Sequence, residues 1–141
     1  MIALLKPSEV FQVEVEPAFT EYLADLLNER RAKYVARAID HHLDWTYEYY
    51  ERVDKSRLLN TGSLRTFRFE LFSRCPELQI MWDISDAAHH RFLTRPGIAR
   101  VVTTASDAFA VQTDELWING YDRPFLPAAT LAVRFWRSWP D

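Results

Sequence analysis

The first half of the chain is dominated by an amphipathic stretch that runs from Pro17 to Lys55 and contains no glycine and no further proline. Its apolar residues first recur at the 3.6-residue spacing of a helix. Further along they form a second stripe, which lies roughly 100–140° around the helix axis from the first. One straight helix cannot present both stripes to one partner. We expect either a break or bend near residues 35–40, which we favour, or a long helix whose halves pack against different elements.

The remaining apolar runs alternate with polar residues, which is typical of half-buried strands. Residues 10–16 alternate in this way before the helical stretch. Behind it, residues 64–73 and 78–84 flank a turn at 74–77, and this arrangement predicts an antiparallel hairpin. A short helix is expected over 87–94. Further strands are expected over 98–104, 108–113, 115–119 and 130–139. The core positions predicted by the alternation are Phe67, Phe69, Ile80, Trp82, Val133 and Phe135.

Together these elements predict an α+β fold, in which a long bent N-terminal helix, or a helix pair, packs on a curved, mostly antiparallel sheet of about six strands. The length of 141 residues and the lack of repeats or linkers predict a single domain over residues 1–141. Folds of this kind host enzymes, binding proteins and scaffolds alike. The function therefore has to be argued from individual side chains.

Composition narrows the classes of partner and compartment. The formal net charge of −3 provides no basic excess that would bind a phosphate backbone, so nucleic acid is not expected as a partner. No apolar run reaches the length of a membrane span, and the first residues lack the basic region of a signal peptide. The single cysteine, Cys75, excludes an intramolecular disulfide. We therefore expect a cytoplasmic protein that does not bind a membrane.

The four histidines form two adjacent pairs, and the first pair supplies the candidate catalytic residues. His42 lies on the apolar stripe of the helical stretch, and Asp44 follows it closely. A histidine and a carboxylate at the mouth of a helix–sheet pocket could act as a general base and its partner. His89 and His90 cannot easily chelate one ion together, because adjacent side chains on a helix point about 100° apart. With no further ligand motif, we expect no metal and no cofactor.

Arg37 and His42 are separated by four residues. A superfamily of all-helical ribonucleases uses such a spacing between an arginine and a histidine. The strand content expected here contradicts an all-helical fold. We therefore treat the match as a coincidence.

The C-terminal run over 130–139 carries the candidate binding residues. If its alternate apolar positions face the core, Arg134 and Trp136 are presented together on the other face, and Trp139 follows them. Tryptophan and arginine are enriched among the residues that anchor protein interfaces. The alternative is that Trp136 is covered by the loop over 121–127 or lies under the sheet.

Two functional hypotheses follow. The first is a small cytoplasmic interaction module, such as an inhibitor, an immunity-type protein or an adaptor. It would bind a protein partner, or form a homodimer, through an aromatic and arginine-rich sheet face. The second is a small enzyme or small-ligand-binding protein with a helix–sheet pocket that uses His42 and Asp44. We favour the first, because no catalytic motif is present and aromatic residues make up 14% of the chain.

Overall fold

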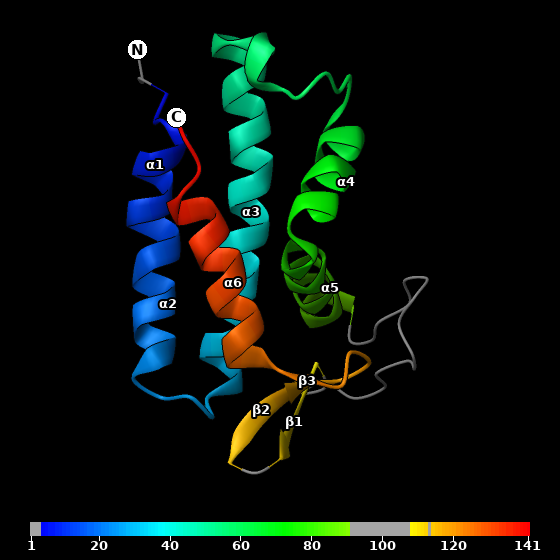
Figure 1. Ribbon diagram of the computed structural model, residues 1–141. Helices are drawn as coiled ribbons and strands as arrows, with labels where there is room; N and C mark the ends of the chain where they lie inside the picture. The colour runs from blue at the N-terminus through cyan, green and yellow to red at the C-terminus, as the bar shows by residue number, and fades with distance from the viewer. Residues whose placement is uncertain (1–3, 91–107, 113) are drawn as a thin grey trace.

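The computed structural model describes residues 4–90, 108–112 and 114–141. Helices account for 70% of these residues, and a small three-stranded antiparallel sheet lies near the C-terminus. The expected α+β fold with a long bent helix on a sheet of about six strands is therefore wrong. Figure 1 shows the helices standing side by side, with the sheet at one end of the bundle.

The described chain opens with a continuous helical column made of three segments: α1 (Pro7–Val10), the π-helix η1 (Phe11–Val15) and α2 (Glu16–Leu23). The strand expected over residues 10–16 is therefore absent. The column descends along one side of the bundle and ends where a short connection turns the chain back (Figure 1).

Helical rather than alternating spacing explains why this segment is not a strand. Phe11 and Val15 are buried four residues apart, whereas Val13 between them is 64% exposed. The wide π turn ends at Val15, two residues before Pro17, which lies in the first turn of α2. In a regular helix the ring of this proline would crowd the carbonyl of Val13. The π turn is the local adjustment that lets the column continue through the proline.

The long helix α3 (Glu29–Val53) begins after a capped turn. The side chain of Asn28 accepts a hydrogen bond from the backbone N–H of Arg31, at 3.0 Å. The expected break near residues 35–40 is wrong, because α3 runs without interruption. The helix boundary lies instead at the connection over 24–28.

Two further helices, α4 (Leu64–Arg74) and α5 (Pro76–His90), replace the expected hairpin. Ser63 caps α4 in a reciprocal capping box with Thr66. Pro76 starts α5, where a proline costs no helix hydrogen bond. Signals for both helix starts are therefore present in the sequence, one before residues 64–73 and one inside the expected turn at 74–77.

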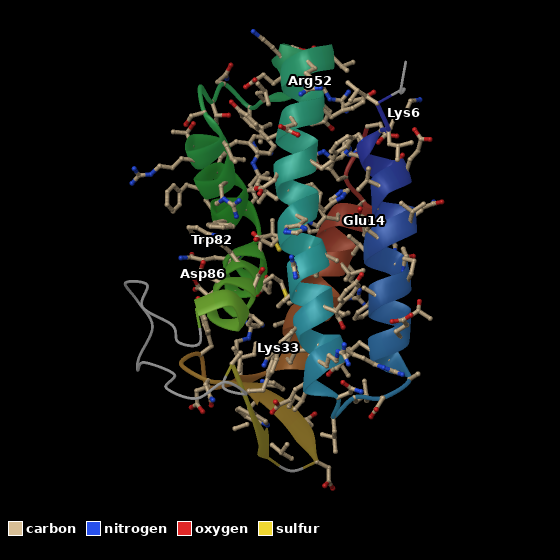
Figure 2. All side chains as sticks on the ribbon, turned by 180° about the vertical axis from the view of Figure 1, so that it is seen from behind. Lys6, Glu14, Lys33, Arg52, Trp82 and Asp86 are labelled. Atoms are coloured by element: carbon tan, nitrogen blue, oxygen red, sulfur yellow. The ribbon has the colours of Figure 1, made fainter. Side chains whose placement is uncertain are left out.

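Helix α3 occupies the centre of the bundle, with α2 on one flank and α4 and α5 on the other (Figure 2). This position accounts for the second apolar stripe, which lies on α3. The first stripe begins in α2, crosses the connection and ends at Tyr34 of α3, and most of its members are exposed: Leu23, Leu26, Leu27 and Tyr34. The stretch over 17–55 therefore forms two helices, as favoured, but they part at 24–28 rather than near 35–40, and one long helix over the whole stretch is also wrong.

The small sheet consists of β1 (Phe109–Gln112), β2 (Glu115–Ile118) and β3 (Arg123–Pro124), all antiparallel. Phe109 pairs with Ile118 at one end of the β1–β2 ladder, and Gln112 pairs with Glu115 at the other. The strands expected over residues 108–113 and 115–119 are confirmed. The strand expected over 98–104 lies outside the described residues, as does the end of the helix expected over 87–94, whose start belongs to α5.

The last element, α6 (Phe125–Arg137), is a helix where a strand was expected over 130–139. It packs against α3, α5 and η1 on the face of the bundle that Figure 1 presents. Beyond it the chain returns to the N-terminal column. The backbone N–H and Oγ of Ser8 donate hydrogen bonds to the Asp141 carboxylate, at 2.9 and 2.5 Å. The two ends of the described chain therefore lie together.

Because the chain is helical here, burial of the expected core residues does not follow the alternation of a strand. Phe67, Ile80 and Val133 are buried, as expected. Trp82 and Phe135 are only partly buried, and Phe69, expected in the core, is 47% exposed. Among the helices of the described residues, none is both long and apolar enough to cross a membrane.

Candidate interaction groove

The structure does not assemble the histidine–aspartate pair expected from the sequence. His42 is 1% exposed and lies edge-on between the rings of Phe11 and Trp136, with ring centroids 5.9 and 4.6 Å away. Its Nδ1 atom has no hydrogen-bond partner among the described residues. Burial lowers the pKa of His42 to about 4, although the nearby Asp141 carboxylate acts in the opposite direction. At neutral pH this side chain is an uncharged part of the core.

Asp44 belongs to a separate cluster on another side of α3. The Arg68 guanidinium reaches across from α4 and bonds both Asp40, at 2.7 Å, and Asp44. The same guanidinium lies over the Trp82 ring, 4.8 Å from its centroid. Burial raises the pKa of Asp44, while Arg68 lowers it. Residues two apart on a helix point about 200° from one another, so His42 and Asp44 face different surroundings.

The spacing between Arg37 and His42, which matches that of the all-helical ribonucleases, was treated as a coincidence because strands were expected. The chain is mostly helical, so that reason no longer holds, but the burial of His42 argues against the match. Arg37 lines an open groove, whereas His42 is enclosed by aromatic rings. A histidine that is 1% exposed cannot reach a substrate in this conformation. The spacing therefore does not bring the two side chains into one site.

The C-terminal candidates are also distributed differently from expectation. Trp136 is 2% exposed and is covered by the helical bundle, so the expectation that an outer sheet face presents it is wrong. Trp139 is partly buried, packs on Trp136 and donates its Nε1–H to the Tyr50 hydroxyl, at 2.8 Å. Of the three expected binding residues, only Arg134 is exposed. The paired surface of Arg134 and Trp136 does not exist in this fold.

The second histidine pair, His89 and His90, ends α5, and its side chains lie outside the described part of the structure.

Among the described residues, a concave surface lies between the N-terminal column and α3. We call it the α2–α3 groove. Its volume is about 860 Å³. Helix α6 packs on the opposite face of the bundle, so this seam stays open on the face seen in Figure 2, where Glu14 is labelled beside it. The residues that matter below are Val13, Glu14 and Glu21 on the column wall, and Arg30, Tyr34 and Arg37 on the α3 wall.

The α3 wall presents one continuous stripe. Arg30, Tyr34, Arg37 and His41 follow each other at spacings of four, three and four residues. At about 100° per residue, these four positions fall within an arc of roughly 60°. Tyr34 is 63% exposed, which is unusual for a large aromatic side chain in the middle of a helix. The stripe therefore combines an exposed aromatic ring with cationic side chains.

The column wall combines apolar and acidic groups. Val13 and Glu14 come from the π-helix, and Glu21 lies seven residues after Glu14, two helical turns along the same face. Single π turns inside α-helices are frequently found at functional sites. Within the described residues, no ion pair involves Glu14, Glu21, Arg30 or Arg37. The groove thus has an acidic wall and a basic wall that do not neutralise each other.

One end of the groove is fixed by hydrogen bonds. Arg31 donates from Nη1 to the backbone carbonyl of Glu21, at 2.8 Å, which ties the end of the column to the start of α3. The Tyr22 hydroxyl donates to the carbonyl of Leu26, at 3.1 Å, and closes the connection between the helices. Three leucines at this end are exposed: Leu23, Leu26 and Leu27. The apolar surface of the groove therefore continues around its end.

A second, smaller hollow of about 440 Å³ lies over α4 and α5. It is lined by Arg65, Phe69 and Trp82, together with Leu64 and Arg68. Arg65 lies over the Phe69 ring, with Cζ 5.8 Å from the centroid. The charge of Arg68 is already matched by two carboxylates, so this surface offers few free polar groups.

Comparison of the chain with protein-family models, with curated proteins and with solved structures finds no match. Among the side chains that the structure describes, no group of three or more His, Cys, Asp or Glu is arranged to hold a metal ion. Sequence reasoning missed the α2–α3 groove, although the spacing of Arg30, Tyr34, Arg37 and His41 was available as a signal. Residues 10–16 of the opposite column had been taken for a strand, and residues 17–23 for the start of the same helical stretch, so the stripe had no facing wall.

Proposed function

We propose that this protein is an interaction module that binds a partner protein through the α2–α3 groove. One observation carries the proposal: Val13 and Tyr34 are 64% and 63% exposed on opposite walls of a groove of about 860 Å³. Exposed apolar side chains gathered in a concave surface and rimmed by polar groups are characteristic of interaction sites. Tyrosine and arginine, which alternate on the α3 wall, are also the residue types enriched among interface hot spots.

The shape of the groove indicates the kind of element that it accepts. It runs between two antiparallel helices, so a helix of the partner can lie along it. Such a helix would present apolar side chains at spacings of three and four residues. Its flanks would carry acidic groups toward Arg30 and Arg37, and basic groups toward Glu14 and Glu21.

The geometry gives less support to the enzyme hypothesis. A general base has to lie within hydrogen-bond reach of the proton that it removes. His42 is enclosed by rings, and Asp44 is held by Arg68 on another side of α3. Neither residue lines the α2–α3 groove.

The test is a quantitative binding measurement with matched variants. A partner is first isolated from the source cells with the tagged protein and then purified, and its dissociation constant is measured for each variant. The variant Tyr34→Ala with Arg37→Glu should weaken binding by about tenfold or more, because it removes the central ring and reverses a charge. Arg65→Glu, a charge reversal at an exposed position of α4, is the control and should leave the affinity within about twofold.

The identification of a partner by capture is not sufficient support by itself. The proposal fails if the purified partner binds the Tyr34→Ala, Arg37→Glu variant as tightly as it binds the wild type. It also fails if Arg65→Glu weakens binding as much as the groove variant does.

A further inference from the structure

We propose that the α2–α3 groove pairs with the same groove of a second copy of this chain, a step that rests on the groove being an interaction surface. The two copies are related by a two-fold axis that runs along the groove. The separation of charge between the two walls, the levels at which the charges lie and the small residues on the groove floor support this arrangement.

The charges of the groove are separated by wall. Glu14 and Glu21 lie on the column, whereas Arg30 and Arg37 lie on α3. Such a surface is complementary to a second copy of itself that is turned so that the acidic wall of each copy faces the basic wall of the other. Partners without such a pattern would leave one of the two walls facing like or unmatched charge.

The acidic and basic groups also lie at matching levels along the groove. The hydrogen bond from the Arg31 side chain to the carbonyl of Glu21 places the end of the column beside the start of α3, which gives the level of the lower pair to within the reach of that side chain. From there Glu14 lies seven residues along the column, and Arg37 lies six residues along α3. At 1.5 Å per residue both positions are about 10 Å away in the same direction, because the two helices are antiparallel. Glu14 is therefore level with Arg37, and Glu21 is level with Arg30.

These levels select the orientation of the symmetry axis. A two-fold axis along the groove exchanges the walls and keeps each level, so Glu14 of each copy faces Arg37 of the other. In the same arrangement Glu21 faces Arg30, and each pair occurs twice because the interface is isologous. An axis across the groove would instead place column against column, with Glu14 opposite Glu21, and like charges in contact are unfavourable.

The apolar side chains fit the same arrangement. Tyr34 lies three residues along α3 from the Arg31 level, and Ala18 lies three residues along the column from Glu21. The Tyr34 ring of one copy therefore meets the small side chain of Ala18 in the other. By the same reasoning, Val13 meets the level of Ala38. Large side chains of one helix pair thus oppose small ones of the other, as ridges oppose grooves in helix packing.

A charge-swap experiment by sedimentation velocity tests the pairing. Wild-type protein should associate to a dimer as its concentration rises. Glu14→Arg alone and Arg37→Glu alone should each raise the dimer dissociation constant by about tenfold or more, because each places like charges opposite one another twice. A mixture of the two variants should form a heterodimer, because each Glu14–Arg37 contact then again joins opposite charges. Arg65→Glu, with a reversal of the same size outside the groove, should dimerise like the wild type.

The outcomes separate this inference from the proposed function. A wild-type protein that stays monomeric at every concentration overturns the second copy as partner. A captured partner that still depends on Tyr34 and Arg37 would leave the groove as a binding surface in that case. A dimer that tolerates both single variants, or a mixture that fails to associate while the wild type does, also overturns the inference. All of the substituted side chains are exposed or line the open groove, and circular dichroism melting of each variant checks that the fold is retained.

Discussion

At the scale of single residues, His42 shows how the fold uses a titratable side chain as an apolar one. Its ring is enclosed by Phe11 and Trp136, and its Nδ1 atom has no partner among the described residues. The backbone carbonyl of His42 accepts a hydrogen bond from the Thr46 hydroxyl, at 2.7 Å. A proton on this imidazole would place an unpaired charge inside the aromatic core. The folded state therefore resists protonation, and stability depends on pH.

The sign of this dependence follows from the two pKa values of His42. The unfolded chain takes up a proton near pH 6.5, whereas the folded protein does so only near pH 4. Stability is fully present above pH 6.5 and is lost as the pH falls toward 4. The difference of about 2.5 between the pKa values corresponds to about 3 kcal/mol. Urea unfolding at about pH 7 and about pH 4.5 measures most of this loss.

Two variants isolate the contribution of His42. His42→Leu should flatten the pH dependence between about pH 6.5 and 4, because the replacement cannot be protonated. His41→Gln, a substitution at an exposed position next to it, should keep the wild-type dependence. If His42→Leu loses as much stability on acidification as the wild type, another group controls the response.

Phe67 and Phe69 show which part of the core could be predicted from the sequence and which could not. Both rings were assigned to the core by alternation, yet one is 0% and the other 47% exposed. Phe67→Ala should lower the free energy of unfolding by about 3–5 kcal/mol, since it leaves a cavity. Phe69→Ala should cost about 1 kcal/mol. Chemical denaturation of both variants measures the difference, and equal losses would favour the strand assignment.

At the scale of elements, the sequence predicted the strands β1 and β2 but not helices α4 and α5. Short alternating runs around Phe67 satisfy a period of two as well as a helical period, so alternation alone could not decide between strand and helix. The deciding signals were the caps. Ser63 precedes the first helix and Pro76 opens the second, and both positions are typical of helix starts rather than of a hairpin turn.

One cation joins α4 to α3, beside the packing of the Phe67 ring on the Tyr47 ring. Arg68 is buried to a large extent and bonds both Asp40 and Asp44. Arg68→Ala should cost about 2 kcal/mol, because it leaves two neighbouring carboxylates without their shared partner, although the more exposed Asp44 is partly screened by water. Asp44→Asn should cost less, because Asp40 keeps its bond to the guanidinium. Thermal melting compares the two, and a larger effect of Asp44→Asn would contradict this account of the cluster.

Only one of the two walls of the α2–α3 groove could be predicted from the sequence. The stripe of Arg30, Tyr34 and Arg37 is visible in the sequence as side chains at helical spacing. Its facing wall could not be recognised, because Val13 lies in a π turn next to a proline, where neither the period of a strand nor that of a regular helix applies cleanly. The prediction of a binding surface around Trp136 was wrong for a different reason. A residue type that is common at interfaces is also a frequent filler of cores, and only packing decides between the two roles.

At the scale of the whole molecule, the bundle has one face that holds it together and one face that is open. On the first, α6 and the returning C-terminal residues cover α3, and both ends of the described chain meet there. On the second, the seam between the column and α3 forms the groove. Stability and association should therefore depend on different residues of the same molecule.

Trp139 and Tyr34 test this separation directly. Trp139→Ala should lower stability by about 3 kcal/mol, because the ring packs on Phe135 and Trp136 and its N–H bonds Tyr50. It should leave association through the groove unchanged at temperatures where the protein stays folded. Tyr34→Ala should weaken association but shift the melting temperature little, since its ring is mostly exposed. The double variant should show the sum of both effects, because the two side chains share no contact among the described residues. A loss of association in Trp139→Ala at full folding would show that the two faces are coupled through α3.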